Sequence, residues 1–585
     1  MCFPRPEKNL LPWLVAWSLV AVAYAFLLKV PFSHAYIDFG DGNYQYISRR
    51  LNEGIRLYTD ILSPQPPFHL WIGAVLERCA EVVGCEPLTL FRWFSVAVRL
   101  AASAAVFAIA RFLFGTPAIA FLASFLFLFL PEGYRWSQGY QSENLEILFL
   151  CGGFLGCLTR IGIGRHLAAI LAVCAVWTNM SALPFSLLII AFAVGAKPFR
   201  WKPLLSSAAC LILLLGLCLS VYGHAYVENV WTNQVASIPA DFHAWLRALH
   251  TEGTTIIELE GLFILAALVG MFGFLKGCGL KERERGTAWP ERDRVFTVGY
   301  GILSLGSAIY VVKGGTVDYI FSLAEPLIAV FSAYALILAF SPSCESSGNG
   351  APEPPNVGFF LPLCRISILV GTIVLLAWTP FNFILGVRSQ GAPGVDLPDT
   401  YQGRLVEFSD VEVRTIERIL GSLSEPGDTI WAPPFLAALS GHPIVMDLSE
   451  TYLWYVRWQH SLHTEKPDVG VERMISGLTD FIEKESIPLF LLNSRTGQWG
   501  QLIIPNLTLR MASPEGGSGI VRIRDLDPRL DRLQSAFEQH YHPILSAPGS
   551  SERLYLQGMN ERLEIWVPKD RSRYLPPWSR KGFSS

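Results

Sequence analysis

The chain has 585 residues, of which 51% are hydrophobic and only 16% charged, and its mean hydropathy is +0.36. This composition excludes an ordinary soluble enzyme, because apolar runs of about 17–25 residues recur, the length that crosses a hydrocarbon core of roughly 30 Å. The net charge of −3 is accompanied by no basic face or arm. No nucleic-acid partner is therefore expected.

The cysteines point to no metal site. Most of the 11 lie inside apolar runs, where they behave as small hydrophobic residues. No Cys-x-x-Cys motif or His/Cys cluster offers zinc ligands. Cys79 and Cys85 could form a disulfide near the outer surface, although a helix would hold them apart.

The first long apolar run, from Leu10 to Leu28, follows two basic residues and contains the peptidase-like Ala23-Tyr24-Ala25. The run continues past this site and further apolar runs follow, so a retained anchor is favoured over a cleaved signal peptide. Either outcome places the next loop outside.

About eleven membrane spans are predicted from the apolar runs. They cover residues 9–31, 90–113, 117–131, 144–160, 167–180, 182–196, 203–223, 254–276, 295–312, 317–340 and 359–384. The basic residues at Arg111, 197–202 and 276–294 all fall on one side if 167–196 is two short spans, broken near Asn179 and Pro184.

The predicted fold class is a polytopic α-helical membrane protein with a C-terminal extracytoplasmic α/β domain. Residues 1–390 would form the transmembrane module and 391–585 the outer domain, because strands and helices alternate after the last span. The predicted helices are 413–424, 435–440 and 471–486, and the predicted strands are 428–431, 443–446 and 487–492. The expected location is the inner (plasma) membrane of a bacterial cell, and an archaeal membrane is the alternative.

The first outer loop, residues 32–89, carries the most informative motif. Asp38 and Asp41 precede or begin a short amphipathic helix at 41–53, with Gly54 placed as its C-cap. Such a helix would lie in the membrane interface. The positive end of its dipole would keep Asp41 ionised, as a general base must be. Helix capping explains both aspartates equally well.

The loop resembles the first outer loop of GT-C glycosyltransferases, in the branch similar to protein mannosyltransferases and aminoarabinose transferases. The matching stretches are Asp41-Gly42-Asn43-Tyr44, Gly54-Ile55-Arg56-Leu57-Tyr58-Thr59-Asp60 and Pro64-Gln65-Pro66-Pro67-Phe68-His69-Leu70-Trp71. The family has Glu after the Asp and Pro before the Tyr, where this chain has Gly42 and Leu57. Asp38 could supply the second acid. The resemblance is specific only in 36–71 and extends loosely over the spans.

The resemblance implies transfer of a monosaccharide from a polyprenyl-phosphate carrier to an acceptor hydroxyl, with inversion, on the outer face. The implied site comprises Asp41 and Asp38 as catalytic acids, Arg99, Lys313 and Tyr319 around the donor phosphate, and Glu143, Asp60 and Tyr44 as orienting residues. A lipid monophosphate needs little metal assistance, so no cofactor is expected, although the two aspartates could hold a divalent ion. The expected partners are the lipid-linked sugar, a lipid, glycan or protein acceptor, and membrane lipids.

Three of these residues also fit purely structural roles. Glu143 begins a span, where an acid stabilises the helix N-terminus; Arg99 could pair with a structural acid such as Glu86; and Lys313 lies in a glycine-rich turn. A transporter or lipid flippase would need broken helices in corresponding halves, of which only the break near Asn179 is found. An inactive scaffold with a GT-C-like base is the third possibility, since the Glu after Asp41 is missing.

Overall fold

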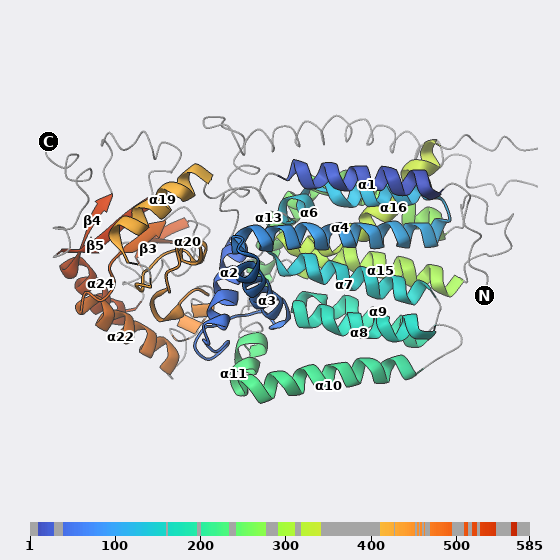
Figure 1. The fold of residues 1–585 in the computed structure, drawn as a ribbon. Coiled ribbons are helices and arrows are strands. Elements are labelled where there is room, and N and C mark those ends of the chain that lie inside the picture. The colour runs from blue at the N-terminus through green and yellow to red at the C-terminus, as the bar shows by residue number, and fades with distance from the viewer. Residues whose placement is uncertain are drawn as a thin grey trace, which may run out of the picture.

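Long helices that run roughly side by side dominate the computed structural model (Figure 1). The structure describes residues 10–28, 39–137, 139–159, 162–195, 201–232, 242–275, 291–310, 318–340, 410–425, 427–450, 453–454, 457–458, 461, 468–493, 508–512, 518–522, 527–545 and 563–569. The predicted span 359–384 therefore lies outside the described residues.

Ten helices of the bundle coincide with the other ten predicted spans. They are α1 (Leu10–Leu27), α4 (Pro87–Phe114), α5 (Pro117–Phe129), α7 (Ser142–Leu158), α8 (Gly162–Thr178), α9 (Leu183–Gly195), α10 (Lys202–Tyr222), α13 (Phe242–Leu275), α15 (Glu291–Tyr310) and α16 (Glu325–Phe340). Proline in the first turn begins α4, α5 and α10, where its fixed φ suits a helix and its missing N–H is not needed.

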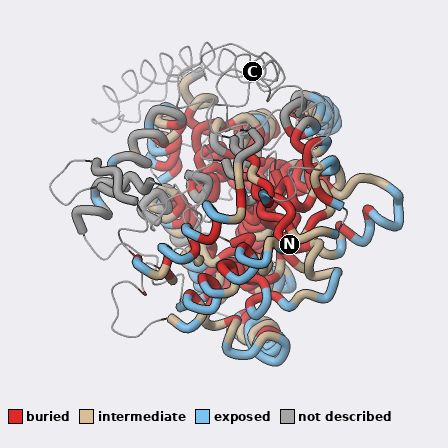
Figure 2. The backbone as a smooth tube through the Cα atoms, turned by 90° about the vertical axis from the view of Figure 1, so that its left-hand side faces the viewer, coloured by how far each residue is buried: buried red, intermediate tan, exposed pale blue. Residues whose placement is uncertain are grey.

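The bundle core forms where α4 packs on α5 and α7, α7 on α8, and α13 on α16. Figure 2 shows the buried residues at the centre and the exposed ones at the rim. Within the described ranges, two helices, α4 and α10, are long and apolar enough to cross a membrane by length and composition, and the other apolar helices are shorter. Eleven crossings thus stay a prediction.

The predicted break between two short spans is confirmed as a break in the helix. A 3₁₀ turn, η2 (Met180–Ala182), separates α8 from α9, and the Asn179 side chain accepts a hydrogen bond from the Ser181 N–H at 3.1 Å. The amide side chain thereby takes over one backbone donor that the interrupted helix leaves unpaired.

Two helices of the predicted first outer loop, α2 (Phe39–Asn52) and α3 (Phe68–Val83), lie between the bundle and the C-terminal strands (Figure 1). The predicted helix 41–53 is thus confirmed, and Gly54 follows it with φ +89°, a conformation that glycine adopts without steric penalty. Cys79 and Cys85 are free thiols. Shorter elements are α6 (Pro131–Trp136), α11 (His224–Val227), η3 (Glu228–Thr232) and η4 (Asp318–Leu323).

The C-terminal region, meaning the described residues from 410 onward, contains both helices and strands. Its elements are α19 (Asp410–Leu423), α20 (Pro434–Ser440), η5 (Val445–Asp447), α22 (Val469–Glu483), α24 (Arg529–His540), β1 (Phe490–Asn493), β2 (Thr508–Ala512), β3 (Ser518–Arg522), β4 (Tyr541–Leu545) and β5 (Leu563–Pro568). The sheet order is β1-β5-β4, all antiparallel, with Leu491 opposite Ile565, and β2 pairs separately with β3.

The three helices predicted in this region are confirmed, but the strands are only partly so. The predicted strand 487–492 appears as β1, and 428–431 is reduced to parallel bridges at Ile430 and Trp431. The predicted strand 443–446 is wrong beyond Ile444, because Met446 and Asp447 have positive φ values of 54° and 51° and form a 3₁₀ turn.

Candidate functional site

Helix α2, which contains Asp41, lies at the boundary between the bundle and the C-terminal region (Figure 1). Asp41 lies in the first turn of α2, while its side chain and all of Asp38 lie outside the described residues. Helix α2 packs on α3 and on α20. By helical spacing, position 41 shares a face with Tyr44 and Ser48, which contact α3.

The predicted orienting residue Tyr44 is buried against His69 of α3, with the ring centroids 4.5 Å apart in an edge-to-face arrangement. Ser48 Oγ donates to the Tyr44 carbonyl at 2.6 Å and reaches the Leu70 carbonyl at 3.4 Å. Burial lowers the pKa of His69 to about 3, although the carbonyls of Pro66 and Thr178 oppose the shift. The imidazole is therefore neutral at physiological pH.

The predicted acid Glu143 lies at the break between α8 and α9. Its Oε1 accepts hydrogen bonds from Asn179 Nδ2 at 2.7 Å and from Ser142 Oγ at 3.1 Å, and the side chain is buried. One turn later, Glu146 accepts from Ser181 Oγ at 2.8 Å. Two buried acids thus face the η2 turn. The sequence analysis predicted Glu143 as a site residue and a break near Asn179, but it missed the hydrogen bond between these two residues.

Arg99, predicted to bind phosphate, forms a buried ion pair with Glu325 of α16. The Arg99 Nη2 atom lies 2.7 Å from both Glu325 Oε2 and the Phe127 carbonyl, and its guanidinium carbon lies 3.7 Å from the Phe127 ring centroid. Glu325 also accepts from the Gly133 N–H. The acid partner is therefore Glu325 and not Glu86. A role toward phosphate stays a prediction.

Replacing Arg99 with Leu is expected to destabilise the protein by about 3–5 kcal/mol, because the Glu325 carboxylate would stay buried without its counter-charge. Replacing both residues with Leu should recover most of this loss. Thermal unfolding in detergent measures both effects. If the doubly substituted protein folds but no longer binds a polyprenyl phosphate, Arg99 has a role beyond the pair; unchanged binding would remove it from the donor site.

The remaining predicted site residues are Asp60, Tyr319 and Lys313, and the described side chains show no contact between them and the first turn of α2. Asp60 is exposed and forms a bidentate pair with Arg56, with both N–O distances 3.0 Å. The Arg56 guanidinium lowers the pKa of Asp60 below its usual range. Tyr319 lies in η4 with its side chain outside the described residues, as is all of Lys313. Their roles stay predictions.

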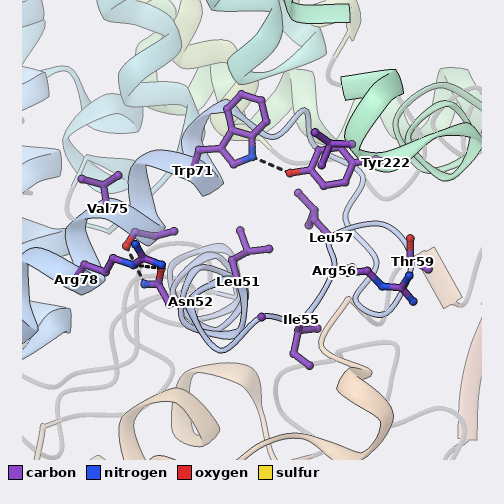
Figure 3. Close-up of a pocket in the computed structure, with 13 residues that line it drawn as sticks. Leu51, Asn52, Ile55, Arg56, Leu57, Thr59, Trp71, Val75, Arg78 and Tyr222 are labelled. Atoms are coloured by element: carbon purple, nitrogen blue, oxygen red, sulfur yellow. Dashed lines mark hydrogen bonds between the residues drawn. The ribbon is translucent and has the colours of Figure 1, made fainter. Parts of the chain in front are cut away.

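A pocket of about 590 Å³ opens beside the far end of α2 (Figure 3). Its walls come from the α2 C-terminus, the following loop, α3 and the end of α10. Trp71 Nε1 donates to Tyr222 Oη at 2.8 Å, and Arg78 Nε donates to Asn52 Oδ1 at 2.9 Å. Ten residues at 1.5 Å each put it about 15 Å along the axis from position 41. Sequence reasoning missed this pocket.

Sequence reasoning also missed the C-terminal acids that contact α2. Glu450 Oε2 accepts from Asn43 Nδ2 at 2.8 Å, and Asp447 accepts from Tyr46 and Arg50. These partners are about 400 positions apart in the chain, so no local pattern pairs them. Among the residues with described side chains, no group of three or more His, Cys, Asp or Glu could hold a metal ion.

Glu77 of α3 is expected to make the stability of the protein depend on pH. Burial raises its pKa to about 7 from 4.5. The folded state therefore holds a proton that the unfolded state releases, and stability falls as pH rises from about 4.5 through 7. Glu77→Gln should reduce the decline in thermal unfolding temperature between pH 5 and pH 8. Glu81→Gln on the exposed face is the control, and an equal decline in Glu77→Gln and wild type would contradict this expectation.

Solved structures that align with this chain include three glycosyltransferases. ArnT from Cupriavidus metallidurans, bound to undecaprenyl phosphate, is 13% identical with a TM-score of 0.49, covering 83% of this chain and 94% of ArnT. An oligosaccharyltransferase from Archaeoglobus fulgidus is 12% identical with a TM-score of 0.49, covering 95% and 81%. The arabinofuranosyltransferase AftD from Mycobacteria is 13% identical with a TM-score of 0.43, covering 94% and 39%.

No protein-family model and no curated protein matches the sequence. The three solved structures are glycosyltransferases, the class of protein that residues 36–71 resemble. With TM-scores below 0.5, they carry no argument about the donor, the acceptor or the catalytic base.

Proposed function

We propose that this protein is a membrane glycosyltransferase that moves a monosaccharide from a polyprenyl-phosphate carrier to an acceptor hydroxyl. The observation that carries the proposal is the motif in residues 36–71. Its described parts form α2, the loop in which Tyr58 Oη donates to the Gln65 carbonyl, and α3, at the junction of the bundle with the C-terminal region. The transmembrane module would be residues 1–390, and 391–585 the extracytoplasmic domain.

In the proposed reaction, Asp41 removes the proton from the acceptor hydroxyl while its oxygen attacks the anomeric carbon. The new carbon–oxygen bond forms as the bond from the anomeric carbon to the phosphate oxygen breaks. The lipid phosphate leaves with the electron pair, and the configuration at the anomeric carbon is inverted. Position 41 lies in the first turn of α2, where the helix dipole favours an ionised carboxylate. Asp38 is the second candidate for the base.

The donor phosphate would be bound by Lys313, Tyr319 and Arg99. Cations beside the leaving oxygen stabilise the charge that develops there. Glu143 and Tyr44 would orient the sugar or the acceptor; both side chains are buried. Asp60 would contribute from the loop after α2, where Arg56 holds it ionised.

A transporter or flippase is the second candidate, favoured by one observation. The interrupted α8–α9 segment places Glu143 and Glu146 beside the 3₁₀ turn η2. Transporters likewise bind their substrates at interrupted helices. A transport function assigns no role to the aspartates of the first outer loop.

The test is a transfer assay on the whole protein in lipid vesicles. Radiolabelled polyprenyl-phosphate hexoses and pentoses would be supplied with membrane extract as acceptor, and label leaving the lipid would be followed, with heat-denatured protein as the control. Release that requires the folded protein and the extract supports the proposal. Movement of labelled donor between leaflets, without release from any of these donors, would replace it with the transporter function.

A further inference from the structure

The C-terminal region holds α2 by an unusually complete set of contacts to Asp447. Asp447 Oδ1 accepts from Tyr46 Oη and from Arg50 Nε, each at 2.7 Å, and Oδ2 accepts from Arg50 Nη2 at 3.1 Å. The arginine and the carboxylate are both mostly buried, with side chains 15% and 13% exposed. A bidentate pair of this kind fixes orientation as well as distance.

Tyr46 donates one of these hydrogen bonds from a buried hydroxyl. Its side chain is fully buried, and its hydroxyl donates to Asp447 while accepting the Ile444 N–H at 2.7 Å. Burial and the neighbouring Asp447 carboxylate raise the pKa of Tyr46 far above its ordinary value. The hydroxyl thus stays a donor at every physiological pH.

The backbone at Asp447 is held in a conformation that residues with a Cβ atom rarely adopt. Met446 and Asp447, in succession, have φ values of 54° and 51°. Such residues persist only where their surroundings determine them, and they cluster at functional sites. The three α2 donors, which are Tyr46 Oη and two guanidinium N–H groups of Arg50, favour this conformation because they bind the Asp447 carboxylate in one position.

A second contact lies at the start of α2, beside position 41. A Cβ atom at Gly42 would lie 2.3 Å from Phe435 Cβ and 2.7 Å from Phe435 Cα. Next to it, Asn43 donates to Glu450. The contacts with the C-terminal region therefore extend from the first turn of α2 to its last, along a face other than that of position 41. They also account for glycine at position 42, where the resembling family has Glu.

We propose that Asp447 and Phe435 make the C-terminal region part of the catalytic apparatus, because together they fix the position of α2 and hence of Asp41. The inference rests on the proposed function, since it needs Asp41 to act on the acceptor. Asp447 is a positioning residue: it acts through Arg50 and Tyr46. Misplacement of a reacting group by about 1 Å is enough to slow a reaction about 100-fold.

The test uses Asp447→Asn, Arg50→Gln and the double variant in the full chain. Each single variant should lower kcat by about 10- to 100-fold, with the KM for donor changed less than about threefold. The double variant should be no slower than the slower single one, because both remove the same link. Glu483→Gln is the matched control. Glu483 also forms a bidentate pair, with N–O distances of 3.0 Å to Arg532, but neither residue belongs to α2 or contacts it through this pair.

Amide hydrogen exchange of residues 39–52 gives a readout that does not depend on activity. Faster exchange in α2 of Asp447→Asn, with unchanged exchange in the bundle helices, supports the inference even if no tested donor reacts with the wild type. If Asp447→Asn has the same exchange rates in α2 and the same kcat as the wild type, the inference is overturned. A lower unfolding temperature with unchanged kcat and KM would also overturn it, because Asp447 would then act on stability alone.

Discussion

Asp41→Asn is expected to lower kcat for sugar transfer by about 10²- to 10⁴-fold, the usual contribution of a general base. Asn has the shape of Asp but cannot accept the acceptor's proton. Asp41 lies inside the first turn of α2, where losing its charge removes a helix-dipole interaction of only about 0.3–1 kcal/mol, so α2 should still form. The measurement is single-turnover transfer from a labelled polyprenyl-phosphate sugar, with donor binding measured separately.

This substitution separates catalysis from stabilisation of the helix N-terminus, a role that would equally account for an aspartate in the first turn of α2. The structural role alone predicts equal transfer by Asp41→Asn and wild type, and that result would remove Asp41 from the chemistry. Asp38→Asn is the paired variant, because Asp38 is the second candidate. A large loss in Asp38→Asn and none in Asp41→Asn would assign the base to the earlier residue.

Gly42→Ala is expected to have the second-largest effect on sugar transfer. The added methyl group would lie 2.3 Å from Phe435 Cβ and within 2.8 Å of its Cα and N atoms, so α2 and α20 would have to move apart. We expect a loss of about 1–3 kcal/mol in stability, as in other overpacked sites, and a loss of transfer at least as large as that of Asp447→Asn. Thermal unfolding and the transfer assay measure the two effects.

The control is Gly421→Ala in α19, where nothing lies within 4 Å of the added Cβ. Alanine favours a helix over glycine by about 1 kcal/mol, so this variant should be equally or more stable and fully active. Equal behaviour of Gly42→Ala and Gly421→Ala would contradict the close contact with α20.

The local features of the fold could be predicted from the sequence because each depends on nearby residues. The amphipathic spacing of 41–53 with Gly54 after it predicted α2, and basic residues in the loops predicted the break beside Asn179. The same reasoning failed at 443–446. Ile-Val-Met has strand propensity, but Met446 and Asp447 have positive φ, and the Asp447 carboxylate accepts hydrogen bonds from Tyr46 and Arg50 of the distant helix α2.

The candidate site could be predicted only where its parts are close in sequence. Glu86 was the natural partner for Arg99 because it is close along the chain, whereas the actual partner, Glu325, is 226 residues away. Asp447 is 397 residues from Arg50 and lies in no motif. Such pairs depend on the packing of distant elements, and one sequence contains no pattern that identifies them.

The contact between Gly42 and Phe435 also bears on how this protein could be rebuilt. The atoms that a Cβ added at Gly42 would meet are the Cβ, Cα and N of Phe435, which almost every amino acid possesses. A smaller residue at 435 would therefore create no room, and the restriction falls on the path of the chain at α20. A chimera that joins another C-terminal region to these helices must reproduce that path, whatever its sequence.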